Sequence, residues 1–104
     1  MTDIKYYVLK TENNTYLGKG GKLLNIGINN FDWWDVKEYA FLDKGKANAK
    51  AKRYNETRKP NTYMTFETSI VFDNKEEKKI FIERFIKPYY KNTKLINKLL
   101  KECE

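Results

Sequence analysis

The chain has 104 residues, a common length for one folded domain, so we expect a single domain spanning residues 1–104. Hydrophobic residues make up 40% of it, and this fraction excludes a chain too polar to form a core. With 21 basic and 14 acidic residues the net charge is +7, so polyanions and acidic protein surfaces are natural partners. A basic balance also serves simply to keep a small protein in solution.

The absence of histidine and the presence of one cysteine, Cys103, limit the chemistry of this chain. Without histidine the usual general base is missing, and Ser69 is the only serine, so the common catalytic triads cannot form. Zinc sites built from cysteine and histidine are excluded by the same counts. We therefore expect a protein that is not an enzyme and that has no metal or cofactor. The single cysteine and the lack of long apolar runs predict a cytoplasmic protein with no membrane contact.

The first part of the chain carries the patterns of β-strands. Residues 4–9 and 15–17 are rich in β-branched and aromatic side chains and are joined by a turn-forming segment, which predicts an N-terminal β-hairpin. After a glycine-rich run at 18–22, apolar residues alternate over 24–28 and predict a short strand. Residues 31–36 and 39–42 are further apolar runs, and we interpret them as another strand.

A basic helix is predicted from Asp43 through Tyr54 or slightly beyond. The Asp43 carboxylate can accept a hydrogen bond from an amide in the first turn. Alanine and tyrosine side chains recur at the spacing of one helix face, and basic side chains recur with the same period beside them. The inner face consists of Ala47, Ala51 and Tyr54. The basic stripe consists of Lys46, Lys50 and Arg53.

The second half of the chain predicts one strand and two helices. Residues 64–72 alternate with the period of a half-buried strand, whose inner side chains are Met64, Phe66, Thr68, Ile70 and Phe72. A capping box formed by Asp73 with Glu76, or by Asn74 with Glu77, opens a helix whose apolar arc runs from Ile80 to Tyr89 and whose end is limited by Pro88. Asn92 or Thr93 then starts an amphipathic helix.

These elements together predict an α+β fold. It contains an N-terminal β-hairpin within an antiparallel sheet of about four strands, one inserted basic helix, and two C-terminal helices packed on the sheet.

Positive charge is concentrated on the predicted helices. Residues 41–60 carry seven basic and two acidic residues, whereas residues 1–40 carry five of each. Because phosphate neutralisation needs several cations on one face, this helix is the strongest nucleic-acid signal in the chain. A solvated helix surface would produce the same pattern. The candidate partner contacts here are Lys46, Lys50, Arg53 and Arg58.

Trp33 and Trp34 form a second candidate surface. Exposed tryptophans anchor protein interfaces or stack on bases, although core packing is favoured for at least one of two neighbours. Adjacent side chains point to opposite faces of a strand, so we expect one tryptophan to be buried and the other presented. Asp32 and Asp35 flank the pair and would repel phosphate, which favours a protein partner at this surface.

Three short patterns resemble nucleotide-binding or nuclease motifs and depart from them. The glycine-rich run at 18–22 invites comparison with a phosphate-binding loop, but Tyr16 replaces its first glycine and Leu23 its Ser/Thr. Asp35-Val36-Lys37 resembles the acid-x-lysine element of restriction-type nucleases, without that fold's separate upstream acid. Residues 7–9 with 16–18 are similar to the two-strand signature of GIY-YIG nucleases, without the first Gly-Ile-Tyr. We therefore expect no nuclease activity.

A longer pattern joins Tyr7–Lys10, Asn14–Gly18 and Tyr39–Phe41 to an alanine- and asparagine-rich helix start at Ala47, Asn48, Ala49 and Ala51. It resembles the hairpin-strand-helix pattern of small phage and prophage accessory proteins, which include anti-CRISPR and other anti-defence inhibitors. The resemblance implies a non-catalytic protein in the host cytoplasm that binds and inhibits or modulates a host defence protein or ribonucleoprotein, such as a CRISPR effector, with direct nucleic-acid contact. The alternative is a non-specific DNA- or RNA-binding domain.

Overall fold

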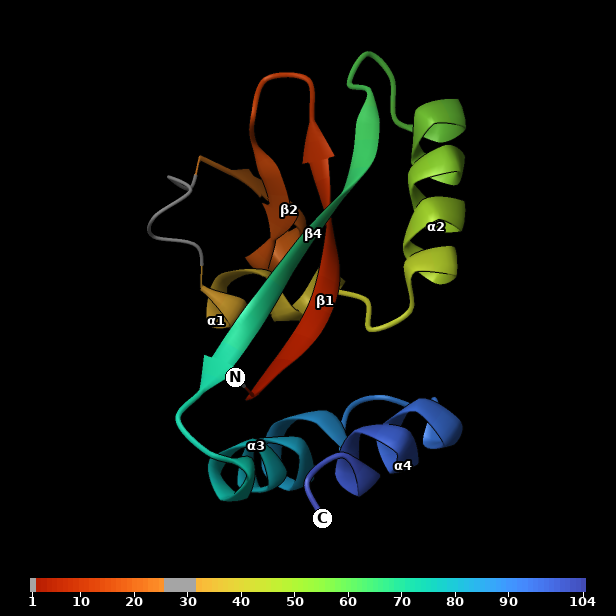
Figure 1. Cartoon of the computed structure of the whole chain (residues 1–104). Helices are drawn as coiled ribbons and strands as arrows, with labels where there is room; N and C mark the ends of the chain where they lie inside the picture. Colours follow the sequence, from red (N-terminus) through yellow and green to blue (C-terminus); the bar gives the residue numbers. More distant parts are fainter. Residues whose placement is uncertain (1, 26–31) are drawn as a thin grey trace. The chain divides into compact units, whose positions relative to one another are not determined.

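The computed structural model describes residues 2–25 and 32–104, and the chain packs into two compact units. The sheet unit is Lys5–Thr68, and the helical unit is Met1–Ile4 with Ser69–Glu104. The expected α+β class is confirmed, while the expectation of one domain stays a prediction. The described elements are β1 (Thr2–Thr11), β2 (Tyr16–Gly18), η1 (Lys19–Gly21), β3 (Lys22–Leu24), α1 (Trp33–Val36), η3 (Lys37–Tyr39), α2 (Lys44–Thr57), β4 (Tyr63–Phe72), α3 (Lys75–Phe81), η4 (Ile82–Ile86) and α4 (Thr93–Lys101) (Figure 1).

The strands form one antiparallel sheet in the order β3-β2-β1-β4. The predicted hairpin of β1 and β2 is confirmed, and its turn is closed by a 2.8 Å hydrogen bond from the Thr11 amide to the Thr15 carbonyl. Asn14 has φ +60° in this turn, a conformation that asparagine tolerates better than most residues. The third strand occupies Lys22–Leu24, earlier than predicted, and positions 26–28 of the prediction lie outside the described residues.

The core of the sheet unit lies on both faces of β1. On one face Leu9 packs in a cluster with Leu17 and with Ala51 and Tyr54 of α2. Tyr6 meets Trp33 of α1 edge to face, with the ring centroids 4.9 Å apart. Because side chains alternate along a strand, Tyr6 and Leu9 point to opposite faces, so β1 is covered from both sides.

Tyr6 makes the stability of the protein depend on pH above the neutral range. Burial raises the pKa of its hydroxyl to about 12, the charge of Asp32 also raises it, and a hydrogen bond with Thr68 lowers it. In the unfolded chain the Tyr6 hydroxyl loses its proton near pH 10, below its pKa in the folded protein. The contribution of this group to the free energy of unfolding is therefore complete below pH 10 and is lost at higher pH. We expect the free energy of unfolding to fall by about 1.4 kcal/mol per pH unit between pH 10 and 12 from this group.

Urea unfolding of the native protein and of Tyr6→Phe, measured from pH 8 to 11.5, checks this expectation. The other tyrosines titrate in both proteins, so the stability advantage of the native protein over the variant should shrink above pH 10. Parallel pH profiles for the two proteins would contradict it.

The sequence predicts a strand over residues 31–36 and 39–42. Residue 31 lies outside the described residues, and for the others this prediction is wrong. Trp33–Val36 forms α1, Lys37–Tyr39 forms a 3-10 turn, and Phe41 makes an isolated bridge with Tyr7. The Asp32 carboxylate caps α1 by accepting a hydrogen bond from the Trp34 amide at 3.1 Å. Trp33 and Val36 are buried three residues apart, which is the spacing of one helix face, and their burial outweighs the local β-propensity.

The strand predicted over residues 64–72 is confirmed as β4, with one side chain misplaced. From Phe66 onward the alternating burial is as expected, but Met64 is 45% exposed. β4 begins one residue earlier, at Tyr63, which is buried against Tyr54 with the ring centroids 5.4 Å apart. Tyr63 points to the opposite face of the strand, which α2 covers, whereas Met64 shares the face of Phe66 but stays exposed near the start of the strand.

Two helical stretches follow β4 in the helical unit, and asparagine caps open both. The amide of Glu77 donates to the Asn74 side chain at 2.9 Å, and the Leu95 amide donates to the Asn92 side chain at 3.2 Å. The Asn74 and Asn92 alternatives of the prediction are therefore confirmed. That these helices pack on the sheet stays a prediction.

In the part of the chain that the structure describes, no helix is long and apolar enough to span a membrane.

The apolar arc predicted for the first of these helices is only partly correct. Ile82 and Ile86 are fully buried, whereas Ile80 and Tyr89 are exposed. The helix continues from α3 into the π-helical turn η4, which places the buried positions at Ile82 and Ile86, and Tyr89 lies beyond its end, after Pro88.

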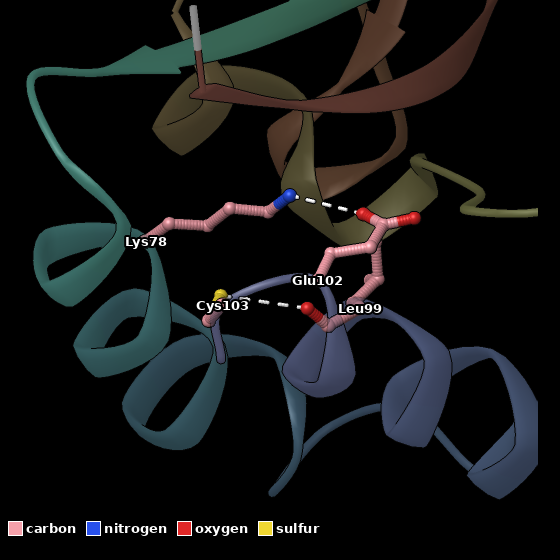
Figure 2. Close-up of polar contacts among 4 residues, drawn as sticks. All are labelled: Lys78, Leu99, Glu102 and Cys103. Carbon is pink, nitrogen blue, oxygen red and sulfur yellow. Dashed lines mark hydrogen bonds and ion pairs between the residues drawn. The ribbon is translucent and has the colours of Figure 1, made fainter.

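An ion pair joins the two ends of the helical unit. Figure 2 shows Lys78 of α3 reaching Glu102, with 3.1 Å between Nζ and Oε2, and the Cys103 thiol donating to the Leu99 carbonyl at 3.4 Å. Lys78 is buried, and a buried charge is costly unless it is paired. The pair therefore favours the arrangement in which the end of α4 lies beside α3, although the half-exposed Glu102 weakens the attraction through solvent screening.

Candidate functional site

The basic helix α2 starts at a capping side chain and is fixed in the sheet unit by its inner face. The Asp43 carboxylate accepts a hydrogen bond from the Gly45 amide at 2.9 Å, as predicted. Ala47, Ala51 and Tyr54 are buried, as predicted, and the helix runs to Thr57, three residues past Tyr54. This anchoring gives the exposed side chains of α2 a defined backbone.

Two asparagines attach one flank of α2 to β4. The Asn48 side-chain oxygen accepts a 2.6 Å hydrogen bond from the Thr65 hydroxyl. The Asn55 amide group donates to the Tyr63 carbonyl at 3.0 Å and accepts from the Tyr63 N–H. The helix turns once in 3.6 residues, so the basic stripe lies on the opposite flank of the buried face. We call the basic flank the surface formed by this stripe, Lys46, Lys50 and Arg53, together with Arg58, the residue that follows the end of α2.

The ring of Tyr54 holds two cations of the basic flank. The Arg58 Cζ lies 4.0 Å from the ring centroid and the Lys50 Nζ lies 5.4 Å from it, both within the range of cation–π attraction. Lys50 and Arg58 stand four residues before and after Tyr54, the spacing at which helical side chains meet. The sequence predicts Tyr54 only as a core residue, and the four-residue spacing to Lys50 and Arg58 is the signal from which this second role could have been found.

The remaining cations of the basic flank face solvent. Lys46 and Arg53 are exposed, and Lys50 and Arg58 remain partly or fully accessible beside the Tyr54 ring. Within the described ranges, no carboxylate forms an ion pair with any of these four residues. The basic flank is therefore a positive surface that no described carboxylate neutralises through an ion pair.

The two tryptophans are divided as expected, one inside and one outside. Trp33 is 4% exposed and packs on Tyr6, whereas Trp34 is 45% exposed and lies under the Lys37 ammonium group, 4.8 Å from its ring. The prediction of opposite orientations is confirmed, although a helical turn produces them. Figure 1 shows α1 and α2 well apart, so Trp34 and the basic flank are separate surfaces of the sheet unit.

The glycine-rich run at 18–22 is a turn that docks on η3. The Gly20 amide donates to the Glu38 carboxylate at 3.2 Å, and Gly20 and Gly21 both have φ +73°. A phosphate-binding loop needs several backbone amides that point at the phosphate. The Gly20 amide instead donates its hydrogen bond to a carboxylate of the same chain. Asp35 lies in helix α1, and among residues 2–25 and 32–104 no group of three or more cysteine or acidic residues could hold a metal ion.

No protein-family model, curated protein or solved structure matches this chain. Function is therefore inferred from the chemistry of its own surfaces.

Proposed function

We propose that this protein acts without catalysis, as a phage-type accessory protein that binds and inhibits or modulates a host defence protein or ribonucleoprotein such as a CRISPR effector. The observation that supports this proposal is the basic flank, which consists of three cations on an anchored helix and one directly after its end, none of them ion-paired with a described carboxylate. A ribonucleoprotein presents phosphates that suit this flank and protein surface that suits the separate, exposed Trp34.

The dimensions of the basic flank fit a short run of phosphates. Lys46 and Arg53 are seven residues apart, about 10 Å along the helix axis at ~1.5 Å per residue. One strand of duplex carries a phosphate about every 3.4 Å of axis, so the flank spans about three of them. Contacts of this kind carry no sequence information. The same flank therefore also supports the second candidate function, a non-specific DNA- or RNA-binding domain.

Affinity capture from a bacterial lysate, with and without nuclease treatment, separates these two functions. Under the lead proposal, a discrete protein complex survives nuclease treatment, and Trp34→Ala weakens it. Met64→Ala serves as the matched control, because Met64 is equally exposed, at 45%, in the same unit. Loss of every captured protein after nuclease treatment would favour the nucleic-acid-binding domain. If neither Trp34→Ala nor Met64→Ala changes the amount of protein captured, Trp34 is not part of the binding surface.

Charge reversal of the basic flank should weaken binding in either case. In Lys46→Glu/Lys50→Glu/Arg53→Glu, we expect affinity for a short duplex to fall at least tenfold at about 0.1 M salt, with the slope of log K against log salt reduced by about 3. The control Lys5→Glu/Lys19→Glu/Lys22→Glu changes the net charge equally at exposed positions outside α2. Fluorescence anisotropy measures the binding, and circular dichroism should show folded variants. Equal losses in both triple variants would contradict a specific role for the basic flank.

A further inference from the structure

A second basic segment lies in the helical unit, across η4 and α4. Residues 84–101 contain six basic residues and no acidic residue. The six cations are Arg84, Lys87, Lys91, Lys94, Lys98 and Lys101. All six are exposed, so this segment presents positive charge independently of the basic flank.

The turn between η4 and α4, residues 87–91, presents an aromatic ring within this basic segment. The amides of Tyr89 and Tyr90 both donate to the Ile86 carbonyl, at 3.1 and 2.9 Å, and Ile86 is fully buried. The Thr93 amide donates to the Lys91 carbonyl at 2.9 Å, which fixes the other end of the turn. The Tyr89 side chain is nevertheless 72% exposed. We call residues 87–91 the aromatic turn.

Tyr89 is flanked in the sequence by two lysines. Lys87 and Lys91 stand two residues before and after it, so their Cα atoms lie within about 7 Å of the Tyr89 Cα. Pro88 restricts the backbone between Lys87 and Tyr89. An exposed ring with an exposed lysine two residues to either side combines the two features of a single-strand site, a stacking surface for a base and charge for the adjoining phosphates.

We propose that the aromatic turn binds single-stranded nucleic acid, with a base stacked on Tyr89 and the flanking phosphates neutralised by Lys87 and Lys91. A duplex is a poor ligand for this turn, because its base faces are covered by their neighbours and only unstacked bases can meet the ring. The basic flank differs in this respect, since its aromatic residue, Tyr54, is buried and leaves only charge for a ligand. The proposal involves a different unit and does not depend on the host partner proposed above.

Fluorescence anisotropy with a labelled 12-nucleotide single strand and its duplex, across a salt series, tests the proposal on the full chain. We expect Tyr89→Ala to weaken single-strand binding roughly five- to hundredfold, the range for removing one stacking ring, and to leave duplex binding within about twofold. Tyr89→Phe keeps the ring and should bind like the native protein. Lys87→Gln/Lys91→Gln should reduce the salt slope by about 1.4 for the single strand.

Two controls keep this result separate from the basic flank and from general charge. Lys98→Gln/Lys101→Gln removes two cations of α4 that lie further along the chain, and it should leave the Tyr89→Ala effect unchanged. The effect should also persist in the Lys46→Glu/Lys50→Glu/Arg53→Glu background, so failure of the basic flank would not affect it. Equal single-strand affinity of Tyr89→Ala and the native protein would overturn the proposal, as would Tyr89-dependent binding to anionic lipid vesicles without binding to the single strand.

Discussion

Replacing Tyr54 with alanine should lower the free energy of unfolding by about 3–5 kcal/mol, the usual cost of truncating a buried aromatic residue. The ring lies in the cluster with Leu9, Leu17 and Ala51, and it meets Tyr63 edge to face at 5.4 Å. Its removal would leave a cavity between α2 and the sheet. Urea unfolding followed by circular dichroism measures the loss.

Tyr54→Phe is the matched control for this prediction. It keeps the ring that packs on Tyr63 and that holds Lys50 and Arg58, so we expect a loss of about 1 kcal/mol or less and unchanged binding to a short duplex. Equal stability of Tyr54→Ala and the native protein would show that α2 is not attached through this ring.

Gly18→Ala should lower the free energy of unfolding by about 3 kcal/mol, because β2 and α1 approach each other at this position. A Cβ on Gly18 would overlap the backbone oxygen of Asp35 and lie 2.6 Å from the Leu24 Cδ1. The leucine side chain can rotate, but the Asp35 oxygen moves only if α1 shifts away from the sheet. Thermal and urea unfolding both report this loss.

Gly45→Ala provides the control for the glycine prediction. The new Cβ would lie 3.3 Å from the Asp43 carboxylate, a side-chain group that can adjust, and alanine favours the helix by up to about 1 kcal/mol. We expect its stability to be equal to or slightly above that of the native protein. If Gly18→Ala is as well tolerated as Gly45→Ala, the close approach of β2 to α1 is wrong.

Much of the candidate site was predictable because α2 follows local rules. The Asp43 cap, the inner face and the basic stripe all depend on positions a few residues apart, and each is found as expected. The attachment of Asn48 to Thr65 and of Asn55 to Tyr63 was not predictable, because these pairs are joined only after β4 has folded beside α2. The flank of α2 that faces solvent is therefore a property of the tertiary structure.

The tryptophan pair shows a prediction that was right for an incomplete reason. Opposite orientations were expected from a strand, and the segment instead forms α1 under the Asp32 cap. The burial of Trp33 rather than Trp34 was decided by the position of Tyr6 on the neighbouring sheet face, which local sequence does not reveal.

The sequence by itself determined the α+β class, the hairpin of β1 and β2, the strand β4, and the cap, inner face and basic stripe of α2, because periodicity and capping act between residues near each other in the chain. Only the tertiary structure decided that residues 33–39 are helical, that Tyr63 rather than Met64 enters the core, and that Tyr89 is exposed. These outcomes depend on contacts between distant segments, where burial against a particular neighbour outweighs the preference of a few residues for one conformation.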